Sequence, residues 1–358
     1  MENKKVLFSG NQAIGEAAIR AGCRAYFGYP ITPQNELPEY MAAHIHRNGG
    51  VFIQAESELA AVNMLIGASA GGARAMTSSS SPGISLKQEG ISYLAGMELP
   101  AVIVNITRGG PGLGNISPAQ SDYFQATRGG GHGDYRVIVL APASVQELIQ
   151  ATMRAFDLAD KYRTPVMILG DGMLGQLREP VILPQPVTEI PERRYTITGA
   201  KGRPARLVKS LILDVQKMEE HNWKLFRKYE IISRKVADAE TEFTDDARLV
   251  VVAFGTAARI AKGAVKRARA EGMPVGLIRP KTLWPFPSKV FADVSRSCSD
   301  FCVFEMNMGQ MVEDVRLSVG PDAKVHFSGR PGGVVPTPVE LYRVIAKIYH
   351  RIKKEGRT

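Results

Sequence analysis

Short apolar segments alternate with amphipathic segments through the first half of this chain, at lengths typical of strands and helices. The segments with strand character are Lys5–Ser9, Ala25–Tyr29, Val51–Ala55, Arg74–Ser78, Ala101–Thr107, Val137–Leu140 and Val166–Gly170. The segments with helical character are Gln12–Ala21, Asn35–Asn48, Ser57–Gly71, Ile84–Gly96 and Val145–Asp160. Because apolar strands separated by helices pair in parallel and are covered on both faces, this alternation predicts an α/β fold.

The alternation breaks after Pro180. A proline-rich and basic stretch follows and reaches Arg206. A charged helix is then expected over Leu207–Glu240. Its apolar side would carry Trp223, Phe226 and Tyr229.

The α/β pattern then resumes and indicates a second domain, because 358 residues exceed what one ordinary core accommodates. The later strands are expected at Leu249–Phe254, Val275–Arg279, Phe301–Glu305 and Val325–Ser328, and a last helix at Thr337–Lys353. We expect a first α/β domain at residues 1–195, a linker with the charged helix at 196–247 and a smaller α/β domain at 248–358.

The composition favours a cytoplasmic protein that binds neither membrane nor nucleic acid. No apolar stretch approaches the roughly 18 residues of a membrane span, and the N-terminal residues lack the pattern of a secretory signal. The net charge is +10, but the basic residues are dispersed and form no known nucleic-acid-binding motif. The charge therefore indicates solubility or an acidic protein partner.

Three cysteines are present, Cys23, Cys298 and Cys302. An iron–sulfur cluster or a structural zinc site normally takes about four thiolate or imidazole ligands. We therefore expect no metal site on this chain. Cys298 and Cys302 are spaced to share a helix face, although a buried free thiol is the commoner role.

Five segments at predicted strand ends carry a family resemblance. They are Gly28-Tyr-Pro-Ile-Thr-Pro33, Gln54-Ala-Glu-Ser-Glu58, Ala75-Met-Thr-Ser-Ser-Ser-Ser-Pro-Gly83, Asn105-Ile-Thr-Arg-Gly-Gly-Pro111 and Glu305-Met-Asn-Met-Gly-Gln310. In this order, and over nearly the whole chain, they resemble the alpha subunit of the 2-oxoacid:ferredoxin oxidoreductases. The similarity is greatest to the 2-oxoisovalerate (3-methyl-2-oxobutanoate) type.

The resemblance implies a pyrimidine-binding thiamine diphosphate domain followed by a transketolase C-terminal-like domain. It implies that a beta subunit holds the cofactor's diphosphate, its Mg and a 4Fe-4S cluster, and that gamma and ferredoxin-like delta subunits complete a hetero-oligomer. The implied enzyme oxidatively decarboxylates a 2-oxoacid, transfers the acyl group to coenzyme A and reduces ferredoxin. Cluster chemistry of this kind implies anaerobic or microaerobic metabolism.

Gly170-Asp-Gly172 is similar to the first half of the magnesium–diphosphate motif of thiamine enzymes, which continues with asparagines. The corresponding region here, around Tyr195–Lys201, contains no asparagine. Asp171 is therefore expected to be a turn residue that closes a strand, with no metal bound.

Glu58 is the candidate catalytic residue. By position alone, an acidic residue in the first turn of a helix is favoured by the helix dipole. Its spacing to Gly67 and to Pro82-Gly83 matches the family pattern without a gap. The resemblance therefore implies that Glu58 binds the pyrimidine ring of thiamine diphosphate, with Glu56 as the alternative.

Arg108 is the candidate for binding the substrate carboxylate. A guanidinium group can bind a carboxylate with two parallel hydrogen bonds, and the family has its substrate arginine at this point. Arg128 is a second candidate that matches the family less well. His132 could titrate near neutral pH, but a structural role is expected for it.

The remaining site candidates follow from the same segments. Thr32 and Ser117 are expected near the substrate. Tyr29 and Pro30 belong to a loop that its prolines make rigid, and they are expected near the cofactor. Ser78 and Ser79 are expected to line the pyrimidine pocket.

The segment Gly109–Ser117 favours a branched-chain substrate. Relatives that act on 2-oxoglutarate carry hydroxyl side chains here, whereas this chain has aliphatic Leu113 and Ile116. A second substrate carboxylate would need polar partners, and a branched alkyl group would not. The alternatives are the same reaction on 2-oxoglutarate, pyruvate or an aryl 2-oxoacid, and a non-catalytic scaffold subunit.

Overall fold

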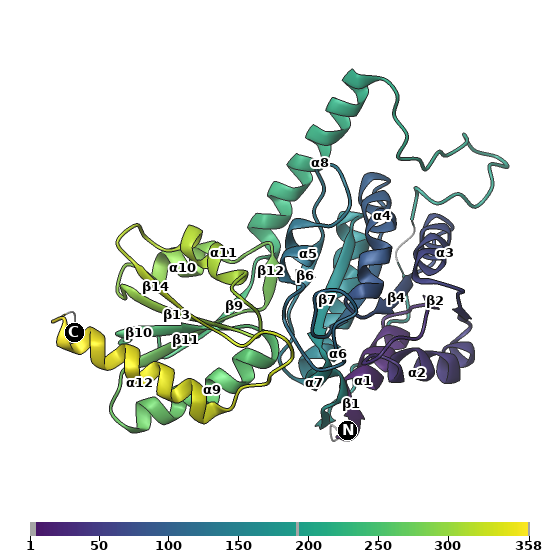
Figure 1. Cartoon of the computed structure of the whole chain (residues 1–358). Helices are drawn as coiled ribbons and strands as arrows, with labels where there is room; N and C mark the ends of the chain where they lie inside the picture. The colour runs from purple at the N-terminus through teal and green to yellow at the C-terminus, as the bar shows by residue number, and fades with distance from the viewer. Residues whose placement is uncertain (1–4, 191–192, 357–358) are drawn as a thin grey trace.

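The computed structural model describes residues 5–190 and 193–356, which form two α/β domains side by side (Figure 1). The first domain is built on a seven-stranded sheet. In sheet order, its strands are β12 (Thr282–Trp284), β6 (Ile138–Leu140), β7 (Pro165–Asp171), β5 (Ala101–Thr107), β4 (Ala75–Ser79), β2 (Ala25–Gly28) and β3 (Val51–Gln54). Every neighbouring pair is parallel except β12 with β6. The predicted α/β fold with a parallel sheet is confirmed.

Helices cover both faces of this sheet. One face packs against α1 (Gly10–Arg20), α2 (Glu36–His44), the 3-10 turn η1 (Ile45–Asn48) and α6 (Val145–Tyr162), and the other against α3 (Glu58–Ala70) and α4 (Pro82–Gly96). Successive side chains of strand β2 enter different cores. Tyr26 joins the core on the α1, α2 and α6 side, and Phe27 joins the core on the α3 and α4 side. This division follows from the pleat, which directs neighbouring side chains to opposite faces.

The first strand lies outside the main sheet, contrary to the expectation that it joins the parallel set. β1 (Val6–Ser9) pairs antiparallel with β8 (Arg178–Val181), at the place where the alternation of strands and helices was expected to break. Val6 and Phe8 pack against the core formed with α1 and α6, whereas Leu7 is exposed. An amphipathic strand of this kind suits a peripheral ribbon, since the central strands are buried on both faces.

The second domain has a five-stranded sheet. In sheet order, its strands are β14 (Lys324–Gly329), β13 (Asp300–Glu305), β10 (Leu249–Val252), β11 (Val275–Pro280) and β9 (Ala239–Glu242). One face packs against α9 (Gly255–Ala270) and α12 (Pro338–Lys354), and the other against α10 (Ser288–Val294) and α11 (Met311–Ser318). The edge strand β9 was not predicted and falls within the expected linker, residues 196–247.

The charged helix is shorter than predicted. α8 spans Val215–Val236 and extends beyond the body of the protein at the junction of the domains (Figure 1). Tyr229 is buried against Trp284, with ring centroids 5.7 Å apart, whereas Trp223 and Phe226 are exposed. Within the described residues, no helix is both long enough and apolar enough to span a membrane.

Strand β12 connects the two domains physically. It follows β11 in the chain but pairs with β6 of the first sheet, so the second domain supplies the last strand of the first. The apolar core on the α3 and α4 side also continues into the second domain through residues such as Val250 and Phe291. The relative position of the domains is therefore fixed by backbone hydrogen bonds as well as by side chains.

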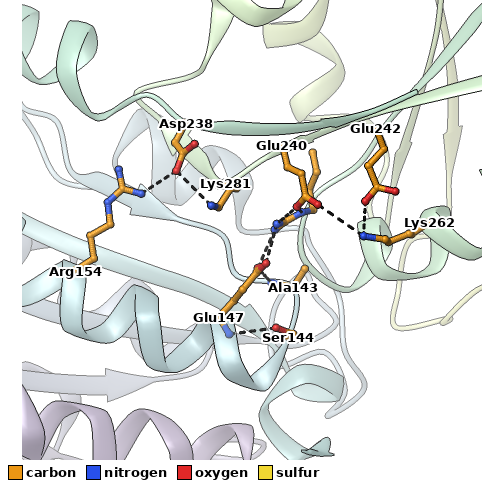
Figure 2. A network of polar contacts seen from close by, with 10 residues as sticks. Ala143, Ser144, Glu147, Arg154, Asp238, Glu240, Glu242, Lys262 and Lys281 are labelled. Atoms are coloured by element: carbon orange, nitrogen blue, oxygen red, sulfur yellow. Dashed lines mark hydrogen bonds and ion pairs between the residues drawn. The ribbon is translucent and has the colours of Figure 1, made fainter. Parts of the chain in front are cut away.

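A network of ion pairs closes the same junction (Figure 2). Arg279 at the end of β11 is buried and binds both carboxylate oxygens of Glu147 on α6, at 2.8 and 2.9 Å, together with Glu240 on β9. Arg154 on α6 binds Asp238 at 3.1 Å. The guanidinium group of Arg279 thus neutralises one carboxylate from each domain, and it lowers the pKa of Glu240.

We expect Arg279→Met to lower the free energy of unfolding by about 2–3 kcal/mol, because two partly buried carboxylates would lose their common cation. Urea denaturation followed by tryptophan fluorescence measures this change. The matched control is Lys289→Met, which breaks an exposed ion pair with Asp293 on α10 and should leave the unfolding curve unchanged. Equal unfolding curves for all three proteins would contradict a stabilising role for Arg279.

Candidate functional site

Four of the five resemblance segments meet where the strands of the first sheet end. In open parallel sheets, ligands bind at the carboxyl ends of the strands. β2, β3, β4 and β5 end in the segments that contain Thr32, Glu58, Ser81 and Arg108. The contacts described below join these four segments into one site.

Glu58 begins helix α3 and is buried, with 6% of its surface exposed. Ser57 caps the helix by accepting a hydrogen bond from the Ala60 amide at 3.1 Å. Among the described residues, no group forms a hydrogen bond or an ion pair with the Glu58 carboxylate. Glu56, the alternative candidate, is exposed. Of the two carboxylates, only that of Glu58 is buried with its oxygens free to accept a hydrogen bond.

Gly83, in the first turn of α4, packs directly against Glu58. A Cβ atom at this position would lie 2.6 Å from Glu58 Oε1 and 2.1 Å from Ser79 Oγ, so a side chain does not fit. The hydroxyl groups of Ser79 and Ser80 are buried and have no hydrogen-bond partner within the described part of the chain. Buried polar groups normally have partners, so these hydroxyls indicate a place where a polar ligand binds.

Ser78 and Ser79 face opposite sides of the sheet. The Ser78 hydroxyl is 2.5 Å from the Tyr26 hydroxyl and also donates to Gln34, on the α1 and α2 side. Ser79 faces Gly83 and Glu58. The alternation of a strand requires this separation. Of the two predicted serines, only Ser79 has a free hydroxyl beside Glu58.

Lys87 was missed by sequence reasoning. It is fully buried in α4, and its ammonium group donates to Thr77 Oγ1 at 3.1 Å. Burial lowers the pKa of Lys87 to about 8, and the nearby charge of Glu58 acts in the opposite direction. The spacing of Gly83, Lys87 and Gly90 places all three on one face of a helix, which is the pattern that could have revealed this lysine.

Arg108 follows β5 and is also buried, with 7% exposure. Its terminal nitrogens donate to the carbonyl oxygens of Thr32 and Leu113, each at 3.0 Å, while its Nε has no partner. Among the described residues, it forms no ion pair. A buried guanidinium group without an acidic partner is costly in isolation and suits a site that receives an anion.

Ser81 links the two halves of the site. Its backbone has a φ of 21°, which is unusual for a residue with a side chain. The Asn105 side chain accepts from the Ser81 amide at 3.1 Å, and the Ser81 hydroxyl accepts from the Arg108 amide at 3.0 Å. Asn105 in turn donates to Asp122 at 2.8 Å, and burial raises the pKa of Asp122. The turn that carries Gly83 is thereby held to the end of β5.

The predicted substrate segment, Gly109–Ser117, is held by the second domain. Asn115 donates to the Gly332 carbonyl at 2.9 Å, and a Cβ at Gly333 would lie 2.6 Å from Ser117. Leu113 and Ile116 expose 81% and 63% of their surfaces. This segment therefore presents aliphatic side chains on the outside of the site.

The fifth segment, Glu305–Gln310, supports the site without entering it. Glu305 is buried and accepts from the Met311 and Val312 amides at 2.8 and 3.0 Å, which caps α11. Burial raises the pKa of Glu305. Gln310 accepts from the Phe124 amide at 2.8 Å, next to the first turn of α5 (Tyr123–Arg128). This motif is an interdomain contact that lies just beyond the substrate segment.

Arg128, the second arginine candidate, forms an ion pair with Asp314 of α11 at 2.8 Å. Its guanidinium group therefore already has an acidic partner, unlike that of Arg108. His132 is exposed and lies near Tyr93 and Gly96, toward the end of α4 opposite to Gly83. Tyr29 and Pro30 are exposed on the loop that carries Thr32, which is half-buried.

Asp171 closes strand β7, as predicted. Its carboxylate accepts from the Met173 and Leu174 amides and so caps α7 (Gly172–Gln176), and it accepts from Thr256 of α9 at 2.9 Å. The three cysteines are buried free thiols, and Cys302 lies in strand β13. In residues 5–190 and 193–356, no group of three or more His, Cys, Asp or Glu side chains is arranged to hold a metal ion.

Comparisons with known proteins match both domains. Residues 16–239 match the thiamine-diphosphate-binding domain of pyruvate flavodoxin/ferredoxin oxidoreductases, and residues 247–341 match core domain II of pyruvate:ferredoxin oxidoreductase. The chain is 49% identical to the ketoisovalerate oxidoreductase subunit VorB of Methanothermobacter thermautotrophicus, with 96% of each chain covered. It is 37% identical to the 2-oxoglutarate synthase subunit KorA of the same organism, over 96% of this chain and 99% of KorA.

Solved structures show the same relationship. The 2-oxoglutarate:ferredoxin oxidoreductase of Magnetococcus marinus, with 2-oxoglutarate, coenzyme A and succinyl-CoA bound, superposes with a TM-score of 0.86 and 28% identity. The match covers 96% of this chain and 65% of that chain. A split-gene transketolase, with a TM-score of 0.59 and 14% identity, shares the fold. The predicted fold class and family are confirmed: this chain belongs to the 2-oxoacid:ferredoxin oxidoreductases, as an alpha-type subunit with a thiamine-diphosphate-binding domain.

Proposed function

We propose that this chain works as the alpha subunit of a complex that oxidatively decarboxylates a branched-chain 2-oxoacid, 3-methyl-2-oxobutanoate. One observation carries the proposal. A buried carboxylate with free oxygens, Glu58, and a buried guanidinium group without an acidic partner, Arg108, flank the same turn of a thiamine-diphosphate-binding domain. The first suits a cofactor ring, and the second suits the carboxylate of a substrate.

The groups beside Glu58 fit the aminopyrimidine ring of thiamine diphosphate. The ring offers nitrogen atoms and an amino group at its edge, and the site offers the Glu58 carboxylate and the unpaired hydroxyl of Ser79. Gly83 lets the first turn of α4 approach the Glu58 carboxylate without displacing it, because a Cβ there would collide with Glu58. Tyr29 and Pro30 lie on the neighbouring loop and would border the ring.

When bound, thiamine diphosphate supplies the nucleophilic carbon and the electron sink that decarboxylation requires. Glu58 would form a hydrogen bond with a pyrimidine ring nitrogen and exchange a proton with it. Its burial favours this role, since hydrogen bonds to charged groups are stronger away from water. Helix α3 and the Ser57 cap would hold the carboxylate in place during turnover.

Arg108 would bind the carboxylate of the 2-oxoacid and orient its 2-oxo group toward the cofactor. Its Nε is free, and its terminal nitrogens are held only by carbonyl oxygens, including that of Thr32. The side chains of Thr32 and Ser117 would border the substrate.

The branched-chain assignment rests on two observations. Leu113 and Ile116 are exposed on the substrate segment, where apolar groups would contact an alkyl chain and offer nothing to a second carboxylate. In addition, the relative at 49% identity is named a ketoisovalerate oxidoreductase subunit, whereas those named for 2-oxoglutarate are 30 to 40% identical.

The remaining parts of the enzyme would come from other subunits. We propose that a beta subunit holds the diphosphate, Mg and a 4Fe-4S cluster, and that gamma and ferredoxin-like delta subunits complete the complex. In the full reaction, the 2-oxoacid and coenzyme A give an acyl-CoA and carbon dioxide. The two electrons released would reduce ferredoxin, and the clusters proposed for the partner subunits would supply the one-electron transfer. A cytoplasmic, anaerobic setting agrees with this chemistry.

Glu58→Gln in the assembled complex should reduce turnover about a hundredfold or more, because the proton relay to the ring nitrogen is lost. Steady-state assays of ferredoxin reduction measure this loss. The matched control is Glu56→Gln, two residues earlier and exposed, which should retain nearly full activity. Unchanged turnover in Glu58→Gln would rule out the assignment and favour a scaffold role for the chain.

Arg108→Lys should raise the KM for the 2-oxoacid by about tenfold or more, because an ammonium group cannot reproduce the paired hydrogen bonds of a guanidinium group. Initial rates at varied 2-oxoacid concentration give this value. Arg128→Met serves as the control and should change the KM little. If Arg128→Met raised the KM and Arg108→Lys did not, the substrate carboxylate would be assigned to Arg128.

The purified complex should have a kcat/KM for 3-methyl-2-oxobutanoate about tenfold or more above that for 2-oxoglutarate, because the aliphatic side chains of Leu113 and Ile116 offer a second carboxylate no polar partner. A panel that also includes pyruvate and an aryl 2-oxoacid tests this order at fixed coenzyme A and ferredoxin. A higher kcat/KM for 2-oxoglutarate would show the reading of Leu113 and Ile116 to be wrong.

A further inference from the structure

A fully buried lysine lies in the contact between α3 and α4, beside the proposed cofactor carboxylate. Gly83 meets Glu58, and a Cβ at Gly90 would lie 2.5 Å from the side chain of Val62. Lys87 falls between these two glycines on the same face of α4, because residues four and three apart lie above one another on a helix. The helices are thus closest on both sides of the lysine.

The contacts of Lys87 hold its charge near Glu58 without an ion pair. Its Nζ donates to Thr77 Oγ1 at 3.1 Å, and the Thr77 hydroxyl donates to the Phe27 carbonyl at 2.6 Å. Within the described part of the chain, the ammonium group pairs with no carboxylate. Of the charged groups on the elements around α4, Glu58 is the one that acts on the pKa of Lys87.

This arrangement is unfavourable for stability by itself. Removing an ammonium group from water is costly, and one hydroxyl compensates for only part of the lost hydration. Burial accordingly lowers the pKa of Lys87 from 10.5 to about 8. A lysine held at such a cost next to an unpaired carboxylate points to a role in the site.

We propose that Lys87 is a positioning residue that balances the charge of Glu58 inside the site and leaves the carboxylate oxygens free for the pyrimidine ring of thiamine diphosphate. The inference rests on the proposed function. Thr77 would be part of this arrangement, because its hydroxyl accepts the hydrogen bond of an ammonium group that forms no ion pair with Glu58. Lys87 itself would touch neither cofactor nor substrate.

The test is the binding of thiamine diphosphate with Mg²⁺ to the assembled, cofactor-stripped complex at a series of pH values. Wild-type affinity should fall as the pH rises past about 8, where Lys87 loses its proton. Lys87→Arg keeps the charge and should remove that fall. Below pH 8, Lys87→Met should bind thiamine diphosphate about tenfold more weakly than the wild type. Its affinity should not fall further as the pH rises past 8.

Two controls separate this role from a structural one. Lys228→Met removes another largely buried lysine, one that pairs with Glu98 far from the site, and should bind the cofactor as the wild type does. The thermal midpoint of Lys87→Met should stay close to that of the wild type, since the cost of burying the ammonium group is removed together with its compensation of the Glu58 charge. The proposal would be overturned if Lys87→Met had a lower thermal midpoint than the wild type and Lys87→Arg did not restore the affinity for thiamine diphosphate.

A thiamine diphosphate analogue with CH in place of the pyrimidine ring nitrogen that would bind Glu58 tests whether Lys87 acts through Glu58. Its affinity should not respond to Lys87→Met, because Glu58 has no ring nitrogen to bind; an equal response would show general damage to the pocket and overturn the proposal. If Lys87→Met binds thiamine diphosphate as the wild type does while Glu58→Gln does not, only the lysine inference fails. If both variants bind it normally, the proposed function fails as well.

Discussion

The close approach of helices α3 and α4 at Gly83 is the constraint on which the candidate site depends. With no Cβ at this position, Glu58 and Ser79 can meet the first turn of α4, and neither would fit beside a larger residue. The same turn continues through Ser81 to Arg108, which it holds by a backbone hydrogen bond. One short segment thus sets the distance between the carboxylate proposed for the cofactor and the guanidinium group proposed for the substrate. A shift at Gly83 would therefore disturb both halves of the site.

The second domain stabilises this arrangement from outside. Its strand β12 completes the first sheet, and its Arg279 neutralises carboxylates from both domains. The segment Glu305–Gln310 docks beside α5, and the turn at Gly332 supports the substrate segment through Asn115. These contacts explain why a family motif lies so far along the chain from the others. It acts on the site through packing, whereas the motifs of the first domain supply the polar groups.

Much of this structure could be predicted from the sequence, and the parts that could not share a physical reason. Strands and helices with a strong periodic pattern were located to within a few residues, and so were the strand ends that precede Glu58 and Arg108. The pairing of β1 with β8 was not predicted, because periodicity reports exposure and not partners. The sequence could not show that the hydroxyl of Ser79 is free and that of Ser78 is hydrogen-bonded, because this depends on which face of the sheet each side chain occupies, and strand register sets that. Lys87 was missed because a charged residue in a helix normally faces solvent.

The same polar groups explain why the site looks incomplete within one chain. Buried charges are usually paired, yet the Glu58 carboxylate and the Arg108 guanidinium group have no charged partner at ion-pair distance among the described residues. Both are held in place by other contacts, so their free atoms are not a consequence of disorder. Such preorganised groups lose little entropy when a ligand binds, and a ligand of opposite charge or with a matching donor adds an electrostatic interaction to them. The second subunit proposed to hold the diphosphate would therefore meet residues already arranged for the binding of the pyrimidine ring and the substrate carboxylate that we propose.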